Sequence, residues 1–109
     1  ANAGAIVMKA SHDGAMGDYP AGVHRNVQIY GNTFRHIGNS AIYLTAAAGG
    51  EIYDNLFEDC CYLQNQEHLF MRRDVALQNC ERITMWDNKT SQDEKDLYYT
   101  KGCKNIKKT

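Results

Sequence analysis

The chain has 109 residues, of which 43% are apolar and 23% charged, and its formal net charge at pH 7 is −1. This size and balance indicate one soluble globular unit, and they give no electrostatic basis for binding nucleic acid or an anionic membrane. The sequence shows no signal peptide and no apolar run near membrane-spanning length. Because it opens at Ala1 without an initiator Met and reaches a strand by Ala5, we expect a piece of a longer chain or a processed product.

The first expected strand covers residues 5–10 and reads Ala-Ile-Val-Met-Lys-Ala. It returns 36 residues later at residues 41–46 as Ala-Ile-Tyr-Leu-Thr-Ala, and residues 69–74 are the expected third copy. The side chains alternate at period two, which is typical of a strand with one face on a core. We expect the second copy to end in the small residues 47–50, after which the pattern restarts.

Residues 11–22 hold three glycines and the only proline, so we expect a long loop between the first two strands. Long loops on a rigid scaffold often carry function. Asp13 is a candidate catalytic residue because a carboxylate beside a histidine can serve acid–base catalysis. His12 and Asp18 are candidate sugar-binding residues. The alternative is a solvated loop in which Asp-Gly supplies turn chemistry.

A second kind of strand begins at Val27 and reads Val-Gln-Ile-Tyr-Gly-Asn-Thr-Phe. It returns after 23 residues as Glu-Ile-Tyr-Asp-Asn-Leu-Phe at residues 51–57, and more weakly as Ile-Thr-Met-Trp-Asp-Asn at residues 83–88. The pairs Cys80 and Cys103, and Ile83 and Ile106, show the same 23-residue shift. A fixed period of this length is the signature of stacked repeat architectures.

These repeats predict an all-β fold, a right-handed parallel β-helix (solenoid) of about four to five rungs of roughly 23 residues with loop insertions. Residues 1–109 form a single segment of it, which we expect to belong to a longer solenoid. Its open ends, at residues 5–10 and 105–109, need covering by the remainder of the parent chain, another copy or a cap. A leucine-rich repeat would need its own leucine spacing, and a sandwich of hairpins would not explain the fixed shift.

Equivalent residues on neighbouring rungs would lie about 4.8 Å apart and form ladders. An inward apolar ladder and an inward aromatic pair are expected from the apolar positions. A turn ladder is expected from the asparagines, which tolerate a left-handed backbone and can bond the neighbouring rung. The three sets are Ile29, Ile52 and Met85; Phe34 and Phe57; and Asn32, Asn55 and Asn88.

Four cysteines occur, at positions 60, 61, 80 and 103. They lack the close pairs with two intervening residues that zinc sites use, so no metal ligand set is predicted. Cys80 and Cys103 are expected to stack as small apolar residues on successive rungs. A disulfide is neither required nor excluded, so the redox compartment stays open.

The pattern Asn-Val-x-Ile-x-Gly-Asn-x-Phe together with Ala-Ile-x-Leu resembles the repeat of the pectate-lyase-like superfamily of right-handed β-helices, over most of residues 5–106. That resemblance implies an extracellular or periplasmic, polysaccharide-active protein: a lyase, a glycosidase, or a surface or tailspike module without catalysis. The polygalacturonase motifs Asn-Thr-Asp, Asp-Asp and Gly-His-Gly are missing from this chain. Either the active site lies outside this segment or the activity differs.

Tyr30, Tyr53 and Trp86 each follow an inward apolar residue, so they are expected to form an exposed aromatic stripe. The C–H faces of sugar rings pack on such surfaces, which makes these three residues candidate substrate-binding residues. The alternative is an outer ladder covered by a neighbouring loop or domain.

Asp54 and Asp87 share the register position just after the stripe. Two carboxylates one rung apart would have roughly the 5 Å separation of a retaining glycosidase, so both are candidate catalytic residues. The stronger alternative is ordinary Asp-Asn turn chemistry. Arg72 and Arg73 end the expected third strand and could hold a uronate carboxylate, although a surface salt-bridge cluster explains them better.

Two functions are therefore open. The first is a carbohydrate-active enzyme, a glycosidase or polysaccharide lyase, that binds an oligo- or polysaccharide along its rungs. The second is a non-catalytic glycan-binding or structural β-helix. No cofactor is predicted, but calcium bridging carboxylates along a cleft, or an acidic pair at catalytic distance, would favour the enzyme.

Overall fold

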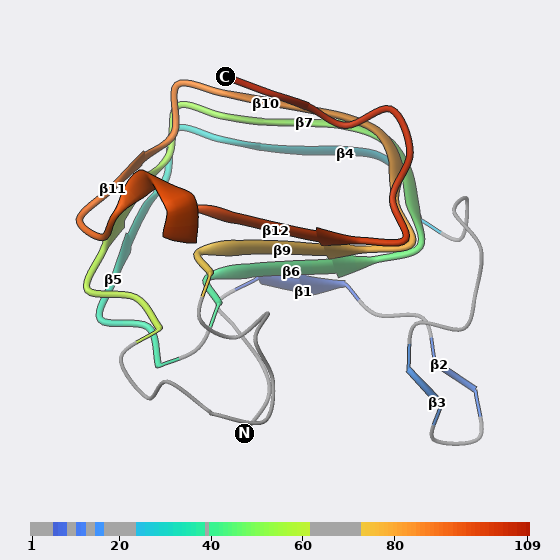
Figure 1. The fold of residues 1–109 in the computed structure, drawn as a ribbon, viewed down its shortest axis with the longest axis horizontal. Helices are drawn as coiled ribbons and strands as arrows, with labels where there is room; N and C mark the ends of the chain where they lie inside the picture. Colours follow the sequence, from blue (N-terminus) through green and yellow to red (C-terminus); the bar gives the residue numbers. More distant parts are fainter. Residues whose placement is uncertain (1–5, 9–10, 13–14, 17–23, 39, 62–72) are drawn as a thin grey trace.

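The computed structural model describes residues 6–8, 11–12, 15–16, 24–38, 40–61 and 73–109. In these residues the regular structure is almost entirely β, with one single-turn 3-10 helix (Figure 1). The strands are β1 (Ile6–Met8), β2 (Ser11–His12), β3 (Ala15–Met16), β4 (His24–Tyr30), β5 (Thr33–Arg35), β6 (Ile42–Thr45), β7 (Ala47–Tyr53), β8 (Leu56–Glu58), β9 (Val75–Gln78), β10 (Glu81–Trp86), β11 (Lys89–Thr90), β12 (Tyr98–Lys101) and β13 (Lys107–Lys108), and the helix is η2 (Glu94–Asp96).

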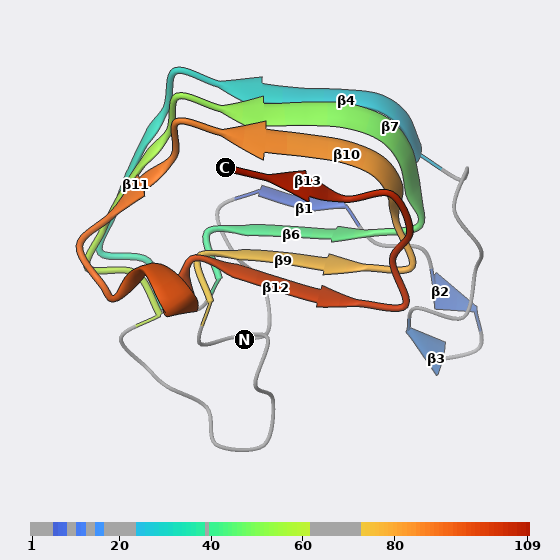
Figure 2. The same ribbon diagram turned by 45° about the horizontal axis from the view of Figure 1, so that its top comes forward.

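Three parallel sheets make up most of the described structure. Their strand orders are β1-β6-β9-β12, β4-β7-β10-β13 and β5-β8-β11. Each coil, meaning one pass of the chain through successive sheets, adds a strand beside its counterpart from the coil before (Figure 2). The short strands β2 and β3 pair antiparallel as a separate hairpin. The prediction of an all-β chain with parallel pairing is therefore confirmed.

The register of the sheets follows the sequence repeat. Ile29 pairs with Ile52, and Ile52 pairs with Met85, as the apolar ladder predicts. Phe34 pairs with Phe57, and their rings stack with centroids 5.2 Å apart. The β10–β13 pairing of Thr84 with Lys107 keeps the 23-residue shift at the last coil. Residues at equivalent positions of the repeat are thus paired on neighbouring strands.

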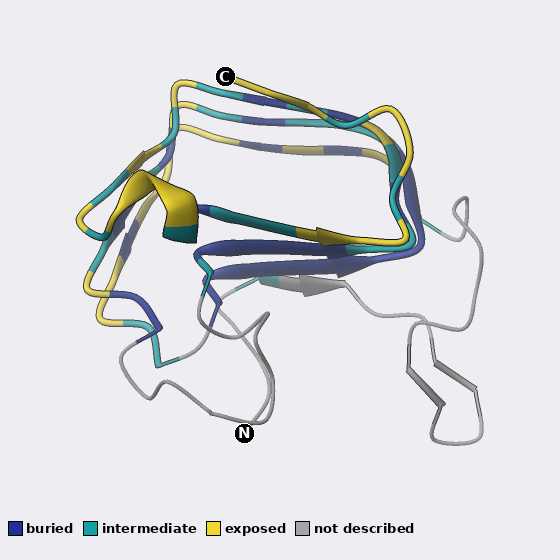
Figure 3. Cartoon of the chain, in the orientation of Figure 1, coloured by how far each residue is buried: buried dark blue, intermediate teal, exposed yellow. Residues whose placement is uncertain are grey.

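The core lies between the three sheets, where the buried segments in Figure 3 face one another. Every residue of β6 is buried, and Val75, Ala76 and Leu77 of β9 are fully buried. Large apolar side chains from all three sheets form one cluster, which includes Ile42, Leu44, Ile52, Phe57, Leu77, Ile83 and Met85. Strands from all three sheets therefore share one apolar core.

Two expected strand boundaries were wrong. The strand that follows β6 in its sheet is β9, with Ile42 beside Val75, so the third copy is residues 75–78 and not residues 69–74. Residues 69–72 lie outside the described part, while Arg73 and Asp74 precede β9 and do not end a strand. The Val-Ala-Leu run of β9 is fully buried. It therefore occupies the core position beside β6 that we expected residues 69–74 to fill.

The small residues 47–50 also differ from expectation, because they open strand β7 and do not end the preceding one. The chain turns at Ala46 instead, where φ is +58°. Gly50 sits so close to β4 that a Cβ there would lie 2.6 Å from the carbonyl oxygen of Val27. Glycine at this position permits the approach of two strands and does not mark a break.

Candidate functional site

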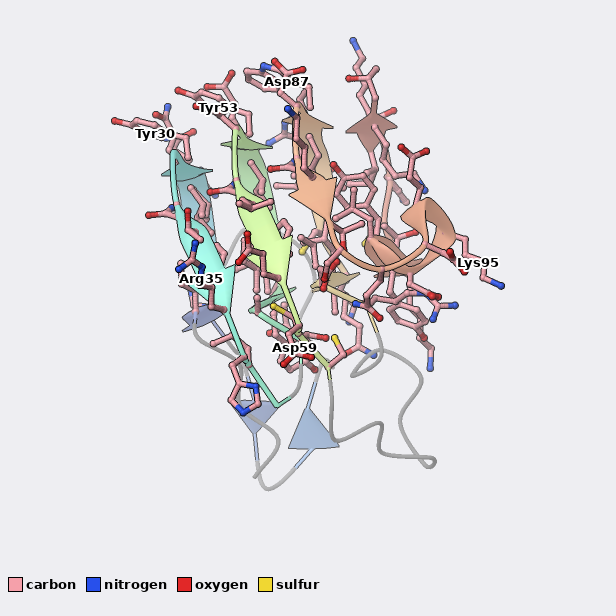
Figure 4. The ribbon with its side chains drawn as sticks, turned by 90° about the vertical axis from the view of Figure 1, so that its left-hand side faces the viewer. Tyr30, Arg35, Tyr53, Asp59, Asp87 and Lys95 are labelled. Atoms are coloured by element: carbon pink, nitrogen blue, oxygen red, sulfur yellow. The ribbon has the colours of Figure 1, made fainter. Side chains whose placement is uncertain are left out.

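The aromatic stripe predicted from the repeat is present at the ends of β4, β7 and β10 (Figure 4). The rings of Tyr30 and Tyr53 have centroids 5.0 Å apart and planes within 6° of parallel. Those of Tyr53 and Trp86 are 4.3 Å apart and within 2° of parallel. Each ring follows an inward residue of the apolar ladder, so the alternation of the strand directs it outward.

The geometry changes what the stripe can offer a ligand. In a near-parallel stack at these distances, the face of each ring packs on its neighbour. The stripe therefore presents ring edges and phenol hydroxyls along its length. Tyr30 lies on β4, the outer strand of its sheet, and is 55% exposed, which leaves its outer face for contact. Tyr53 and Trp86 are half-buried.

Each stripe residue is followed by a corner with a left-handed backbone. Gly31, Asp54 and Asp87 have φ values of +68°, +55° and +53°. The asparagines were expected to take this conformation, but it falls on the residue before each of them. Glycine and aspartate tolerate a left-handed φ better than most residues, so the corner explains their presence. Here the chain leaves one sheet and enters the β5-β8-β11 sheet.

The predicted asparagine ladder holds these corners together. The Asn32 side-chain amide donates to Asn55 Oδ1 at 3.2 Å, and the Asn55 amide donates to Asn88 Oδ1 at 3.0 Å. Backbone amides follow the same path, from Asn32 to Asn55 Oδ1 and from Asn55 to Asn88 Oδ1. Asn88 in turn donates to the Tyr98 hydroxyl at 2.9 Å. The ladder therefore fixes the position of each corner relative to the equivalent corner of the neighbouring coil.

An open hollow of about 310 Å³ lies at these corners and is lined by residues from three successive coils. It is lined by Gly31, Asn32, Thr33, Asp54, Asn55, Leu56, Asp87 and Lys89. Its polar lining offers a hydroxyl, two carboxylates and an ammonium group within one concave surface. Such a set donates and accepts hydrogen bonds at once, as a ligand rich in hydroxyl groups requires.

The two candidate catalytic aspartates line this hollow together. The backbone amide of Asp54 donates to the Trp86 carbonyl at 3.2 Å, so Asp54 sits beside the start of the next corner, which carries Asp87. Both side chains are exposed. Their left-handed backbone accounts for an aspartate at each corner without a catalytic role.

The other candidate residues do not join this site. Arg73 lies just before β9, away from the strands that carry the stripe, and forms an ion pair with Asp96 at 3.0 Å. His12 lies in the β2–β3 hairpin, and its side chain is outside the described structure. Asp13, Asp18 and Arg72 also lie outside the described residues.

Asp74 is a buried carboxyl that the sequence did not single out. It is 0% exposed, and its Oδ1 accepts a hydrogen bond from Gln92 Nε2 at 2.8 Å. Its Oδ2 has no hydrogen-bond partner among the described residues. Burial raises the pKa of Asp74 to about 6. Hydrogen bonds from Thr90 and Gln92 lower this pKa, but by less than burial raises it. The only signal for it in the sequence is its position directly before the apolar run that forms β9.

All four cysteines are free thiols, and Cys60, Cys61 and Cys80 are buried. Within the described ranges, no group of three or more His, Cys, Asp or Glu side chains could hold a metal ion. In the same ranges, no helix is long and apolar enough to cross a membrane.

Comparisons with protein-family models, with curated proteins and with solved structures found no match to this chain. The site's own geometry therefore carries the functional argument.

Proposed function

We propose that this chain is a segment of a right-handed parallel β-helix that binds a glycan across its coils, as part of a carbohydrate-active protein. Three parallel sheets with matching register support the β-helix, because one continuous winding explains why every sheet takes its strands from successive coils. Parallel strands joined by crossovers are almost always right-handed, which supports the hand.

The observation that carries the glycan proposal is the juxtaposition of the stripe and the hollow. Tyr30 supplies an exposed ring face next to Gly31 and Thr33, which line the hollow. A sugar ring pairs an apolar C–H face with equatorial hydroxyls, so it matches an aromatic surface beside a polar concavity. Because the hollow spans three coils, an oligosaccharide fits it better than a single sugar.

Binding can be followed through Trp86, the only tryptophan, which stacks on Tyr53 within the stripe. Titration with a panel of acidic and neutral oligosaccharides is expected to shift its fluorescence saturably with one sugar class. Tyr30→Ala and Lys89→Ala should each weaken that binding by about tenfold, the equivalent of about 1.4 kcal/mol. Lys101→Ala, which removes an exposed lysine from β12 in another sheet, is the matched control and should leave binding unchanged.

A panel in which no sugar changes the fluorescence would overturn the proposed binding, provided that isothermal calorimetry also shows no heat. Equal weakening by Lys89→Ala and Lys101→Ala would show general charge attraction and not a site in the hollow.

A second candidate is catalysis by the paired aspartates, which line the same hollow on consecutive coils. In that case one carboxyl protonates the glycosidic oxygen while the other acts as nucleophile. Release of reducing ends from the sugar class that binds is then expected, and Asp54→Asn or Asp87→Asn should lower the rate at least a hundredfold while binding persists. If the wild-type chain bound the sugar without cleaving it, catalysis would be ruled out and the chain would be a non-catalytic glycan-binding module.

A further inference from the structure

Cys80 and Cys103 occupy matching positions on the last two coils. The residues that follow them, Glu81 and Lys104, form a parallel β-bridge. The backbone amide of Lys104 donates to the Cys80 carbonyl at 3.0 Å, and the backbone amide of Cys80 donates to Cys103 Sγ at 3.5 Å. The two cysteines are thus direct neighbours across the stack, as the 23-residue shift predicted.

Their side chains also point the same way. Cys80 Sγ donates to the Gln78 carbonyl at 3.3 Å, and Cys103 Sγ donates to the Lys101 carbonyl at 3.5 Å, in each case two residues back along the chain. Matching positions on parallel neighbours are separated by about 4.8 Å, which is within the Cα separation that a disulfide spans. The described structure therefore holds two thiols within reach of a covalent link between coils.

The two thiols differ in reactivity. Cys80 is 1% exposed, whereas Cys103 is only half-buried on the outer coil. The hydrogen bond between the two thiols lowers the pKa of Cys103 to about 6, and the same bond and burial raise the pKa of Cys80. The hydrogen bond from the backbone amide of Cys80 to Cys103 Sγ also favours the Cys103 thiolate. Because the thiolate is the nucleophile and Cys103 is the more exposed of the two, Cys103 would attack first and Cys80 would resolve the intermediate.

We propose that Cys80 and Cys103 form a redox-active thiol pair that a low-molecular-weight disulfide, such as glutathione disulfide, oxidises to a bond between coils. The Cys103 thiolate attacks one sulfur of that disulfide, breaks its S–S bond and releases one small thiolate, which leaves a mixed disulfide on Cys103. Cys80 then passes its proton to the released small thiolate and attacks the Cys103 sulfur, releasing the second small thiolate. The two protein thiols are oxidised and one small disulfide is reduced to two thiols.

The resulting bond would be easily reversed. Disulfide geometry brings the Cβ atoms to about 3.8 Å, closer than the usual spacing of parallel neighbours, so the bond would pull the two corners together. Strained disulfides have more oxidising potentials and are reduced readily by small thiols. Oxidation would tie the outer coil, with β12 and β13, to the coil that carries Trp86.

The test uses the native wild-type chain, incubated with glutathione disulfide, quenched with acid, alkylated and mapped by peptide mass spectrometry. We expect loss of two alkylatable thiols and a cross-linked pair of peptides containing Cys80 and Cys103. Cys103 should react at least about tenfold faster than Cys60 and Cys61, which are buried. An excess of reduced dithiol should restore both thiols.

Two variants separate the roles. Cys80→Ser should stop at one stable glutathione on Cys103, and Cys103→Ser should leave position 80 unmodified in the folded chain. The proposal is overturned if the wild-type chain keeps a mixed disulfide at Cys103, if its native thiols stay unmodified while the urea-unfolded chain reacts, or if Cys60 and Cys61 react at the same rate. These outcomes are read on the wild-type chain, so they hold even if a variant fails to fold.

Discussion

Replacement of Asn55 by alanine is expected to lower the free energy of unfolding by about 4 kcal/mol. Asn55 is 2% exposed, and its side chain donates to the carbonyl of Ile29 and to Asn88 Oδ1. Its Oδ1 also accepts from the backbone amide and the side-chain amide of Asn32. Alanine leaves the Ile29 carbonyl without its buried hydrogen bond and removes the part-buried bonds to Asn32 and Asn88. A buried polar group left unpaired costs about 1–3 kcal/mol. Urea denaturation followed by Trp86 fluorescence measures the loss.

Asn32→Ala is the matched control, because the same residue type occupies the same corner on the outer coil. Asn32 is exposed, and truncation removes only its side-chain donation to Asn55 Oδ1. A loss of about 1 kcal/mol is expected there. If the two variants lost the same stability, the asparagine ladder would not be a buried tie between coils.

The buried Asp74 is expected to make the chain less stable as the pH rises from about 4 to about 6. Its pKa is about 6 in the folded chain, against 3.8 for an ordinary aspartate. Between these values the folded state binds a proton that the unfolded state has lost, so the proton favours folding. That contribution is complete below pH 3.8 and is lost as the pH rises through 6. At neutral pH the difference amounts to at most about 3 kcal/mol.

Asp74→Asn removes this titration while Oδ1 can still accept from Gln92. The difference in unfolding free energy, variant minus wild type, should therefore rise by up to about 3 kcal/mol between pH 4 and pH 7. Urea denaturation at several pH values measures it. A difference that stays flat over this pH range would mean that the Asp74 carboxyl is solvated or paired in solution.

The ladders could be predicted from the sequence because a stacked fold places repeated residues in repeated surroundings. Ile29 pairs with Ile52, and Ile52 with Met85, because the repeated pattern of an apolar residue followed by an aromatic one marks the register even where the spacing is not 23 residues. The aromatic stripe followed from the same shift and from strand alternation. The sequence repeat does not determine how the aromatic rings of the stripe are tilted. Only the structure shows that their faces pack on one another.

Predictions failed where the length of a coil departs from the repeat. Between β8 and β9 the chain contains extra residues, and two apolar segments compete to be the third copy of β6. Periodicity alone could not show that residues 75–78, and not 69–74, return to the sheet in phase. Asp74 was hidden for the same reason, since its burial depends on where that strand begins.

The unequal coils have a consequence for how such a protein can change. Tyr30 and Tyr53 are 23 residues apart and Tyr53 and Trp86 are 33 apart, yet both pairs stack. Extra chain at one corner is therefore absorbed locally, and the face carrying the stripe and the hollow keeps its phase. A change in the length of that corner would therefore leave the geometry of this face intact.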